Sequence, residues 1–130
     1  MEQVSGTVLY VEDNLENRIL VRRILMAEGY EVLEAESAAA GLELAQGQKP
    51  QLVLVDINMP HLDGLSLTSI MKADPALQSI PVVALTANVM KGDKERTLAA
   101  GCDGYIQKPI DVDFFPRQIA RFMQQTESKG

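Results

Sequence analysis

Short apolar stretches in this chain stop abruptly at polar or charged residues. Residues 8–11 read Val-Leu-Tyr-Val and lead directly into Glu12 and Asp13, and residues 52–55 read Leu-Val-Leu-Val and lead into Asp56. Continuous apolar runs of this length are typical of strands that are buried on both faces of a parallel sheet. A further apolar run at 81–86 and two shorter stretches at 31–35 and 105–107 predict the other three strands.

Apolar residues at helical spacing occupy the segments between these strands. Leu15, Ile19, Leu20 and their successors form a stripe that ends near Gly29, and Asn14 offers a side chain to cap this first helix. Ser37 is placed to cap the second helix in the same way. The five expected helices run from about residue 15 to 28, 38 to 46, 65 to 73, 91 to 100 and 116 to 123.

The alternation of strands and helices predicts an α/β fold. Strand-helix-strand units of this spacing form right-handed crossovers, which give a doubly wound, five-stranded parallel sheet with helices on both faces. The chain shows no repeat or linker, so we expect a single domain over residues 1–130. Its core is expected at about 7–124, and residues 125–130 are expected to form a loose tail.

Charge and composition restrict the class of partner. The 130 residues carry a formal net charge of −6, which argues against nonspecific binding to nucleic acid or to an anionic membrane. The sequence has no signal-peptide pattern and no apolar run of membrane-spanning length, so we expect a cytoplasmic protein without membrane insertion. A single cysteine, Cys102, and a single histidine, His61, cannot form an internal disulfide or, by themselves, a zinc site.

The acids at the strand ends are the first candidates for chemistry. Because chemistry collects at the carboxyl ends of parallel strands, Glu12, Asp13 and Asp56 are expected to form one site. Three carboxylates repel one another unless a cation lies among them, and oxygen ligands of this kind suit Mg2+. The alternatives are that Asp56 has only a turn or capping role, and that Glu12 and Asp13 only complement the dipole at the N-terminus of the helix that follows them.

Two other strand ends add complementary groups. Thr86 ends the fourth predicted strand with a hydroxyl, and Lys108 follows the fifth with an ammonium group directly before Pro109. A cation and a hydroxyl beside a metal and a carboxylate are the groups that a phosphoryl group requires. The alternatives are that Thr86 reflects β-propensity and that Lys108 is merely solvated.

Four segments, taken in order, resemble one known family. They are Val11-Glu12-Asp13-Asn14, Asp56-Ile57-Asn58-Met59-Pro60 with Asp63-Gly64, Leu85-Thr86-Ala87, and residues 100–109. From Val8 to about Met123 the chain resembles the receiver domains of two-component response regulators, and most closely those of single-domain phosphorelay proteins and hybrid histidine kinases. The resemblance implies a flavodoxin-like strand order, 2-1-3-4-5.

The resemblance also implies a role for each site residue. Asp56 would be the phosphoacceptor, taking a phosphoryl group from the histidine of a kinase or of a histidine phosphotransfer protein. Mg2+, or Mn2+ in its place, would lie between Glu12, Asp13, Asp56 and the backbone carbonyl of Asn58. Lys108 would pair with the phosphoryl oxygens, next to a Lys108–Pro109 peptide bond that is cis in this family.

The family also implies how the phosphorylated state is transmitted and ended. Thr86 would move to bond the phosphoryl group, and Tyr105 would swing inward in response. The surface formed by the fourth helix, the fifth strand and the last helix would then change for a downstream protein target. Asn58 and Asn88 would tune hydrolysis of the phosphoryl group. The protein would thus be a switch that catalyses its own phosphorylation and dephosphorylation, rather than an enzyme that turns over a substrate.

Three alternatives use similar features. A haloacid dehalogenase-like phosphatase also carries an aspartate at a strand end, but a second acid is expected two residues later, where this chain has Asn58. A flavodoxin-like cofactor binder needs a first loop that accepts phosphate, which Glu12 and Asp13 would repel. A receiver fold that only binds proteins, without phosphorylation, is the third alternative.

Overall fold

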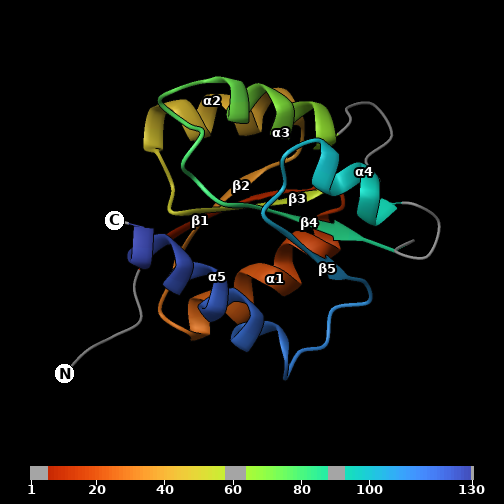
Figure 1. The fold of residues 1–130 in the computed structure, drawn as a ribbon. Coiled ribbons are helices and arrows are strands. Elements are labelled where there is room, and N and C mark those ends of the chain that lie inside the picture. The colour runs from red at the N-terminus through yellow and green to blue at the C-terminus, as the bar shows by residue number, and fades with distance from the viewer. Residues whose placement is uncertain (1–5, 58–63, 88–92, 130) are drawn as a thin grey trace.

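A parallel sheet forms the centre of the computed structural model, which describes residues 6–57, 64–87 and 93–129. Its strands are β1 (Thr7–Val11), β2 (Glu31–Ala35), β3 (Leu52–Asp56), β4 (Val82–Thr86) and β5 (Gly104–Gln107). They lie in the order β2-β1-β3-β4-β5, and every neighbouring pair is parallel (Figure 1). The predicted α/β class and the flavodoxin-like strand order are therefore confirmed.

Helices cover both faces of this sheet. They are α1 (Leu15–Ala27), α2 (Ala38–Gln48), α3 (Gly64–Ala73), α4 (Asp93–Ala99) and α5 (Phe115–Lys129). Helices α1 and α5 pack on one face, and α2 and α3 pack on the other (Figure 1). Because all the strands run in one direction, their carboxyl ends meet at a single end of the sheet.

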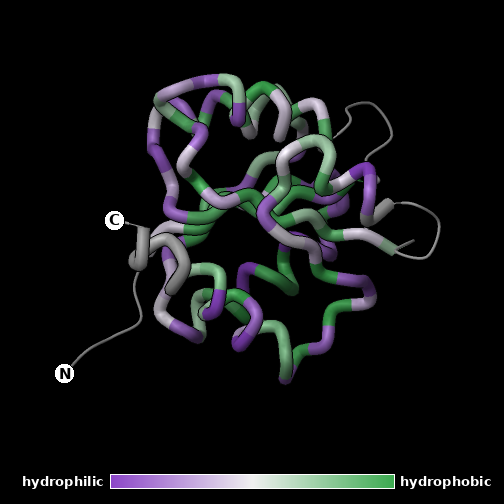
Figure 2. The backbone as a smooth tube through the Cα atoms, viewed as in Figure 1, coloured by the Kyte–Doolittle hydropathy of each residue, from purple (hydrophilic) through white to green (hydrophobic). Residues whose placement is uncertain are grey.

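Burial on both faces explains the unbroken apolar sequences of the central strands. Leu9 and Val55 belong to the core beneath α2 and α3, whereas Tyr10 and Leu54 belong to the core against α1 and α5. All four are 0% exposed, and Figure 2 shows hydrophobic residues along these strands. Full burial of a Leu or Val side chain stabilises a protein by about 1.5–3 kcal/mol, so both cores hold their helices on the sheet.

Side-chain caps begin the first two helices as predicted. The side chain of Asn14 accepts a hydrogen bond from the backbone N–H of Asn17 at 2.9 Å. The Ser37 hydroxyl oxygen accepts one from the backbone N–H of Ala40 at 3.1 Å. Each cap satisfies a backbone donor that the first helical turn leaves free. Because Asn14 begins α1 immediately after Glu12 and Asp13, its cap also fixes how the acidic segment leaves β1.

The buried face of α1 is narrower than the apolar stripe suggests. Val21, Ile24 and Leu25 are the buried residues of α1. Leu15 and Leu20 are 59% and 40% exposed, although both belong to the predicted stripe. A helix on a sheet buries only the part of its surface that faces the strands, so apolar residues at the margin of the stripe remain accessible.

The end of the chain differs from its expected form. Residues 125–130 were expected to form a loose tail, but α5 runs from Phe115 to Lys129. The sequence from 124 to 129 contains Gln, Glu and Lys and has neither Gly nor Pro, so no residue in it breaks a helix. Helix α5 therefore continues past the last predicted apolar position.

Lys72 ties three segments together at the opposite end of the sheet from the acids. Its Nζ donates to the carbonyl oxygens of Gln78 at 3.1 Å and Ile80 at 2.8 Å, and to Asp103 Oδ2 at 2.9 Å. Asp103 Oδ2 also accepts a hydrogen bond from the backbone N–H of Val82 at 2.8 Å. The end of α3, the loop that follows it and the turn before β5 thus share one ammonium group, and Asp103 extends the contact to the start of β4.

Lys72→Met is expected to lower the free energy of unfolding by about 1–3 kcal/mol, because two carbonyls and a carboxylate would lose their common donor. Urea denaturation followed by circular dichroism measures the change. Arg23→Met, at an exposed position on α1, is the control and should alter stability much less. Equal stabilities for the two variants would contradict a structural role for Lys72.

Candidate active site at the carboxyl ends of the strands

The structure brings the three predicted acids together. Strands β1 and β3 are adjacent and parallel, with Val11 opposite Val55, so the residues that follow these two leave the sheet side by side. Carboxylate oxygens of Glu12, Asp13 and Asp56 all lie within 4.8 Å of one another. Glu12 and Asp56 are buried at 1% and 4% exposure, whereas Asp13 is exposed. The cluster is therefore open to solvent on the Asp13 side.

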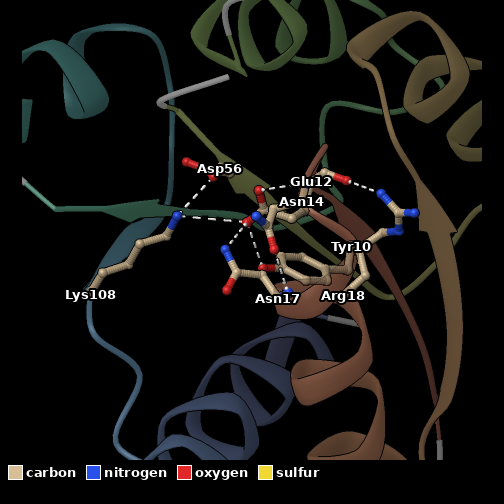
Figure 3. Close-up of polar contacts among 7 residues, drawn as sticks. All are labelled: Tyr10, Glu12, Asn14, Asn17, Arg18, Asp56 and Lys108. Atoms are coloured by element: carbon tan, nitrogen blue, oxygen red, sulfur yellow. Dashed lines mark hydrogen bonds and ion pairs between the residues drawn. The ribbon is translucent and has the colours of Figure 1, made fainter. Parts of the chain in front are cut away.

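Lys108 reaches this cluster from the end of β5, the edge strand that β4 separates from β3. Its backbone N–H donates to the Thr86 carbonyl at 2.8 Å, which extends the pairing of β5 with β4. Its Nζ donates to Asp56 Oδ2 at 2.8 Å and lies 3.6 Å from Glu12 Oε1 (Figure 3). The Lys108–Pro109 peptide bond is cis. One ammonium group thus partly balances two buried carboxylates.

Glu12 is held by donors from its own strand and from α1. Its Oε1 accepts hydrogen bonds from the Tyr10 hydroxyl at 2.9 Å and from Asn17 Nδ2 at 3.4 Å. Its Oε2 accepts one from the backbone N–H of Asn14 at 3.2 Å. Arg18 supports the same segment, because its Nη1 donates to the Glu12 carbonyl at 2.8 Å (Figure 3).

Burial changes the proton affinities of these groups. Burial and the adjacent Asp56 raise the pKa of Glu12 to about 7, against the opposing effects of Tyr10 and Lys108. Burial, together with the nearby charge of Glu12, also raises the pKa of Tyr10 above its ordinary value. The Tyr10 hydroxyl therefore keeps its proton and acts as the donor to Glu12.

The two predicted switch residues lie on the neighbouring strands. Thr86 is the last residue of β4 and is 0% exposed, and it stands opposite Gln107 of β5. Tyr105 pairs with Ala84 and is partly buried against the core beneath α2 and α3. Thr86 therefore ends β4, which lies between β3, the strand that carries Asp56, and β5, the strand that leads to Lys108.

This arrangement matches a known family over most of the chain. The family model of the response regulator receiver domain matches residues 8–120. The chain belongs to the response regulator receiver domain family. It is thus a signalling domain of two-component systems. Domains of this family interact with histidine kinases or phosphotransfer proteins. The match supports the receiver prediction over the phosphatase-like and cofactor-binding alternatives.

Individual relatives agree with this assignment. The chain is 43% identical over 120 residues to the polar-differentiation response regulator DivK of Brucella ovis, covering 92% of this chain and 98% of the relative. The DivK protein of Brucella anthropi is 42% identical over 117 residues, which cover 90% of this chain and 95% of that protein.

Solved receiver structures share the fold. A receiver domain of a sensor histidine kinase from Pseudomonas aeruginosa, with a magnesium ion coordinated in its active-site cleft, is 31% identical. It superposes with a TM-score of 0.85 over 93% of this chain and 99% of that one. A chemotaxis response regulator of Vibrio cholerae, 25% identical, superposes with a TM-score of 0.85 over 92% of this chain and 99% of its own.

Some predicted positions of the receiver lie outside the described residues. Asn58, predicted to bind the metal and to tune hydrolysis, and Asn88, predicted to tune hydrolysis, are among them, and so is His61. The metal ligand and hydrolysis roles of the two asparagines stay predictions. Within the described ranges, no helix of the receiver is both long and apolar enough to cross a membrane.

The groups that support Glu12 were not predicted from the sequence. Tyr10 was predicted only as part of an apolar strand, and no contact with Glu12 was predicted for Asn17 or Arg18. One signal was available, because residues two apart on a strand project from the same face, which places Tyr10 beside Glu12. The contacts of Asn17 and Arg18 depend on the path of the chain around Asn14, which the sequence pattern does not define.

An open cleft lies next to Lys108. Its volume is about 560 Å3, and its walls come from α1 and from the segments that follow β4 and β5. The lining residues are Asn17, Leu20, Ala87, Lys108, Pro109 and Ile110. The cleft therefore gives a molecule from solvent access to the ammonium group that contacts Asp56.

The raised pKa of Glu12 predicts how stability depends on pH without metal. Between the ordinary value of 4.5 and about 7, the folded chain holds this proton more firmly than the unfolded chain, so the free energy of unfolding falls as pH rises. The free energy of unfolding of Glu12→Gln, minus that of the parent, should therefore be larger at about pH 8 than at about pH 5. Urea denaturation in EDTA measures both values. Glu43→Gln, exposed on α2, should show no such dependence. A stability difference for Glu12→Gln that is equal at both pH values would contradict the shift.

Proposed function

We propose that Asp56 is the phosphoacceptor of this receiver and that it takes its phosphoryl group from the phosphohistidine of a partner protein in a Mg2+-dependent reaction. The observation that carries the proposal is the position of the Asp56 carboxylate. It lies among the acids on one side and 2.8 Å from the Lys108 ammonium group on the other. Among the carboxylates in the described ranges, only that of Asp56 both belongs to the acidic cluster and accepts a hydrogen bond from a lysine.

The donor set fits Mg2+. Glu12, Asp13 and Asp56 offer three carboxylates, which are hard oxygen ligands, and the exposed Asp13 leaves room for the waters that Mg2+ retains. The carbonyl of Asn58 is the proposed fourth protein ligand, and Mn2+ would suit the same donors. The magnesium ion in the related Pseudomonas aeruginosa receiver supports this choice. Bound Mg2+ would neutralise the repulsion between the attacking carboxylate and the phosphoryl oxygens.

Asp56 and Lys108 have different roles in the proposed reaction. An Asp56 carboxylate oxygen attacks phosphorus, and a new O–P bond forms as the P–N bond to the donor imidazole breaks. The electron pair of the P–N bond stays on the ring nitrogen, which takes a proton from solvent. As the O–P bond forms, Lys108 exchanges its contact with Asp56 for a bond to a phosphoryl oxygen, where it stabilises the developing charge. Because these groups all belong to the receiver, the chain catalyses its own phosphorylation. Water later cleaves the acyl phosphate, at a rate that Asn58 and Asn88 are proposed to tune.

The signal is proposed to leave through the neighbouring strands. A phosphoryl group on Asp56 would draw the Thr86 hydroxyl toward it, and Tyr105 would turn inward into the space that this movement opens. The burial of Thr86 and the partial burial of Tyr105 support this coupling, because neither side chain can move without its neighbours adjusting. The surface of α4, β5 and α5 would then favour a different arrangement, which a downstream protein binds.

The phosphoryl donor is proposed to dock on α1 and the adjacent cleft. Leu15 and Leu20 are 59% and 40% exposed on α1, and Leu20 lines the cleft that leads to Lys108. Such apolar side chains at the rim of a site suit the surface of a histidine kinase or histidine phosphotransfer protein. The chain would act as one receiver domain with a core at about 7–124, in the cytoplasm where such donors present their histidine.

Intact mass spectrometry after incubation with acetyl phosphate tests this function. With Mg2+ we expect the addition of one phosphoryl group, and with EDTA we expect none. A small phosphate ester such as p-nitrophenyl phosphate should not be hydrolysed with repeated turnover, since a receiver is modified once. An unchanged mass in Mg2+, or continuous hydrolysis of the ester, would overturn the proposal.

A further inference from the structure

A buried hydroxyl lies directly beneath the acidic cluster. Tyr10 is 0% exposed, and its ring belongs to the core packed against α1 and α5. Its hydroxyl emerges from that core and donates to Glu12 Oε1 at 2.9 Å, as Figure 3 shows. Because a phenylalanine ring would fill the same space, packing alone does not require the hydroxyl. Its distinguishing contact is the hydrogen bond to Glu12.

Glu12 depends on a small number of donors. It is only 1% exposed, so protein groups must replace the water that would otherwise solvate its carboxylate. Oε1 is contacted by the Tyr10 hydroxyl at 2.9 Å, Asn17 Nδ2 at 3.4 Å and Lys108 Nζ at 3.6 Å. The Tyr10 contact is the shortest of the three, and it comes from a residue fixed in the core.

We propose that Tyr10 is a positioning residue for the metal site, whose hydroxyl fixes the Glu12 carboxylate in the orientation that binds Mg2+. This inference rests on the proposed Mg2+-dependent function. A rigid strand sets the position of Tyr10, so the bond to Oε1 restricts rotation of the carboxylate. The bond from the Asn14 N–H to Oε2, at 3.2 Å, restricts the same rotation from the other oxygen. The remaining lone pairs then stay directed toward the cluster formed with Asp13 and Asp56.

Lys108 cannot take over this task. In the proposed reaction its ammonium group moves to the phosphoryl oxygens, so its contact with Glu12 weakens when phosphorylation begins. Asn17 lies on α1 at the border of the cleft, and its contact of 3.4 Å is long for a hydrogen bond. Of the three contacts to Oε1, only that of Tyr10 is both short and made by a residue that the proposed reaction does not move.

Removal of the hydroxyl should therefore weaken Mg2+ binding and leave the fold intact. Groups that orient a metal ligand typically change metal affinity by about 10–100-fold when they are removed. Tyr10→Phe is expected to raise the Mg2+ dissociation constant about tenfold, measured by isothermal titration calorimetry. Tyr30→Phe is the matched control, because Tyr30 is 5% exposed in the same core but precedes β2, at the opposite end of the sheet. Its affinity should equal that of the parent.

Kinetics distinguish positioning from a general structural effect. In Tyr10→Phe, the phosphorylation rate with acetyl phosphate should reach its half-maximum at a Mg2+ concentration about tenfold higher than in the parent. At saturating Mg2+ the rate should return to the parent value. A lowered plateau with an unchanged half-maximum would overturn the positioning role.

A second measurement needs no substitution. The chain has three tyrosines and no tryptophan, so 13Cζ labelling of tyrosine gives few resonances in an NMR spectrum. Mg2+ should shift the resonance of Tyr10 and leave that of Tyr30 in place. Equal Mg2+ affinity in Tyr10→Phe and parent, or an unshifted Tyr10 resonance on saturation, would overturn this inference alone. A parent protein that does not bind Mg2+ would overturn the proposed function as well.

Discussion

Asp56→Asn is expected to abolish phosphorylation by acetyl phosphate while the protein stays folded. An amide is not a nucleophile toward phosphorus, so the O–P bond cannot form at this position. The substitution also removes one negative charge from a cluster in which three carboxylates lie within 4.8 Å of one another. The relief of this repulsion offsets the lost bond to Lys108, so a large loss of stability is not expected. Intact mass spectrometry and thermal unfolding measure the two effects.

Asp113→Asn provides the matched control for this substitution. Asp113 is exposed in the segment between β5 and α5, so the same change of carboxylate to amide removes an equal charge outside the acidic cluster. It should accept one phosphoryl group, as the parent does. Full modification of Asp56→Asn would mean that another residue is the acceptor.

Lys108→Met is expected to change phosphorylation and metal binding in opposite directions. Loss of the ammonium group removes the charge that stabilises the transferred phosphoryl group, so the rate should fall by about 100–1000-fold at saturating Mg2+. The same loss removes a cation that lies 2.8 Å from Asp56 and 3.6 Å from Glu12, so Mg2+ should bind more tightly. Stopped-flow phosphorylation and calorimetry measure the two quantities separately.

Lys49→Met serves as the control for charge. Lys49 is the exposed C-cap residue of α2 and precedes β3, at the other end of the sheet from the acids. It should change neither the rate nor the affinity appreciably. A Lys108→Met variant that phosphorylates normally would remove Lys108 from the proposed chemistry, and weaker Mg2+ binding would contradict the competition between the two cations.

The strand ends were the most predictable part of the molecule. Because β1 and β3 are buried on both faces, their apolar runs are unbroken, and the first charged residue marks where each strand leaves the sheet. The parallel arrangement then brings Glu12 and Asp56 to the same end, as predicted. Lys108 followed from the same rule, applied to β5. The local sequence was sufficient here because burial and direction act on every residue of these strands.

Other features depend on contacts between distant segments. Helical spacing placed Leu15 and Leu20 on the apolar stripe of α1, but the sheet covers only the part of that stripe around Val21 and Leu25. The spacing of apolar residues describes the face of a helix and does not define how far its neighbours extend. The end of α5 was missed for a related reason, since its last residues carry no apolar periodicity and yet are compatible with a helix.

The support that Arg18 gives to the acidic segment could be seen only in three dimensions. Arg18 donates to the Glu12 carbonyl and also lies 3.4 Å from Glu34 of β2, which in turn pairs with Arg22 at 2.9 Å. These contacts join α1, β2 and the segment after β1. Each partner is an ordinary polar residue in the sequence, and the chain path around Asn14 determines which of them meet.

Locating the phosphoryl group on the chain tests directly whether Asp56 is the phosphoacceptor. After treatment with acetyl phosphate and Mg2+, borohydride reduction converts an aspartyl phosphate to homoserine, and tandem mass spectrometry of the peptides then identifies the modified position. We predict homoserine at residue 56 and at no other acid. Homoserine at Asp13, or a phosphoryl group found instead on His61, would contradict this prediction.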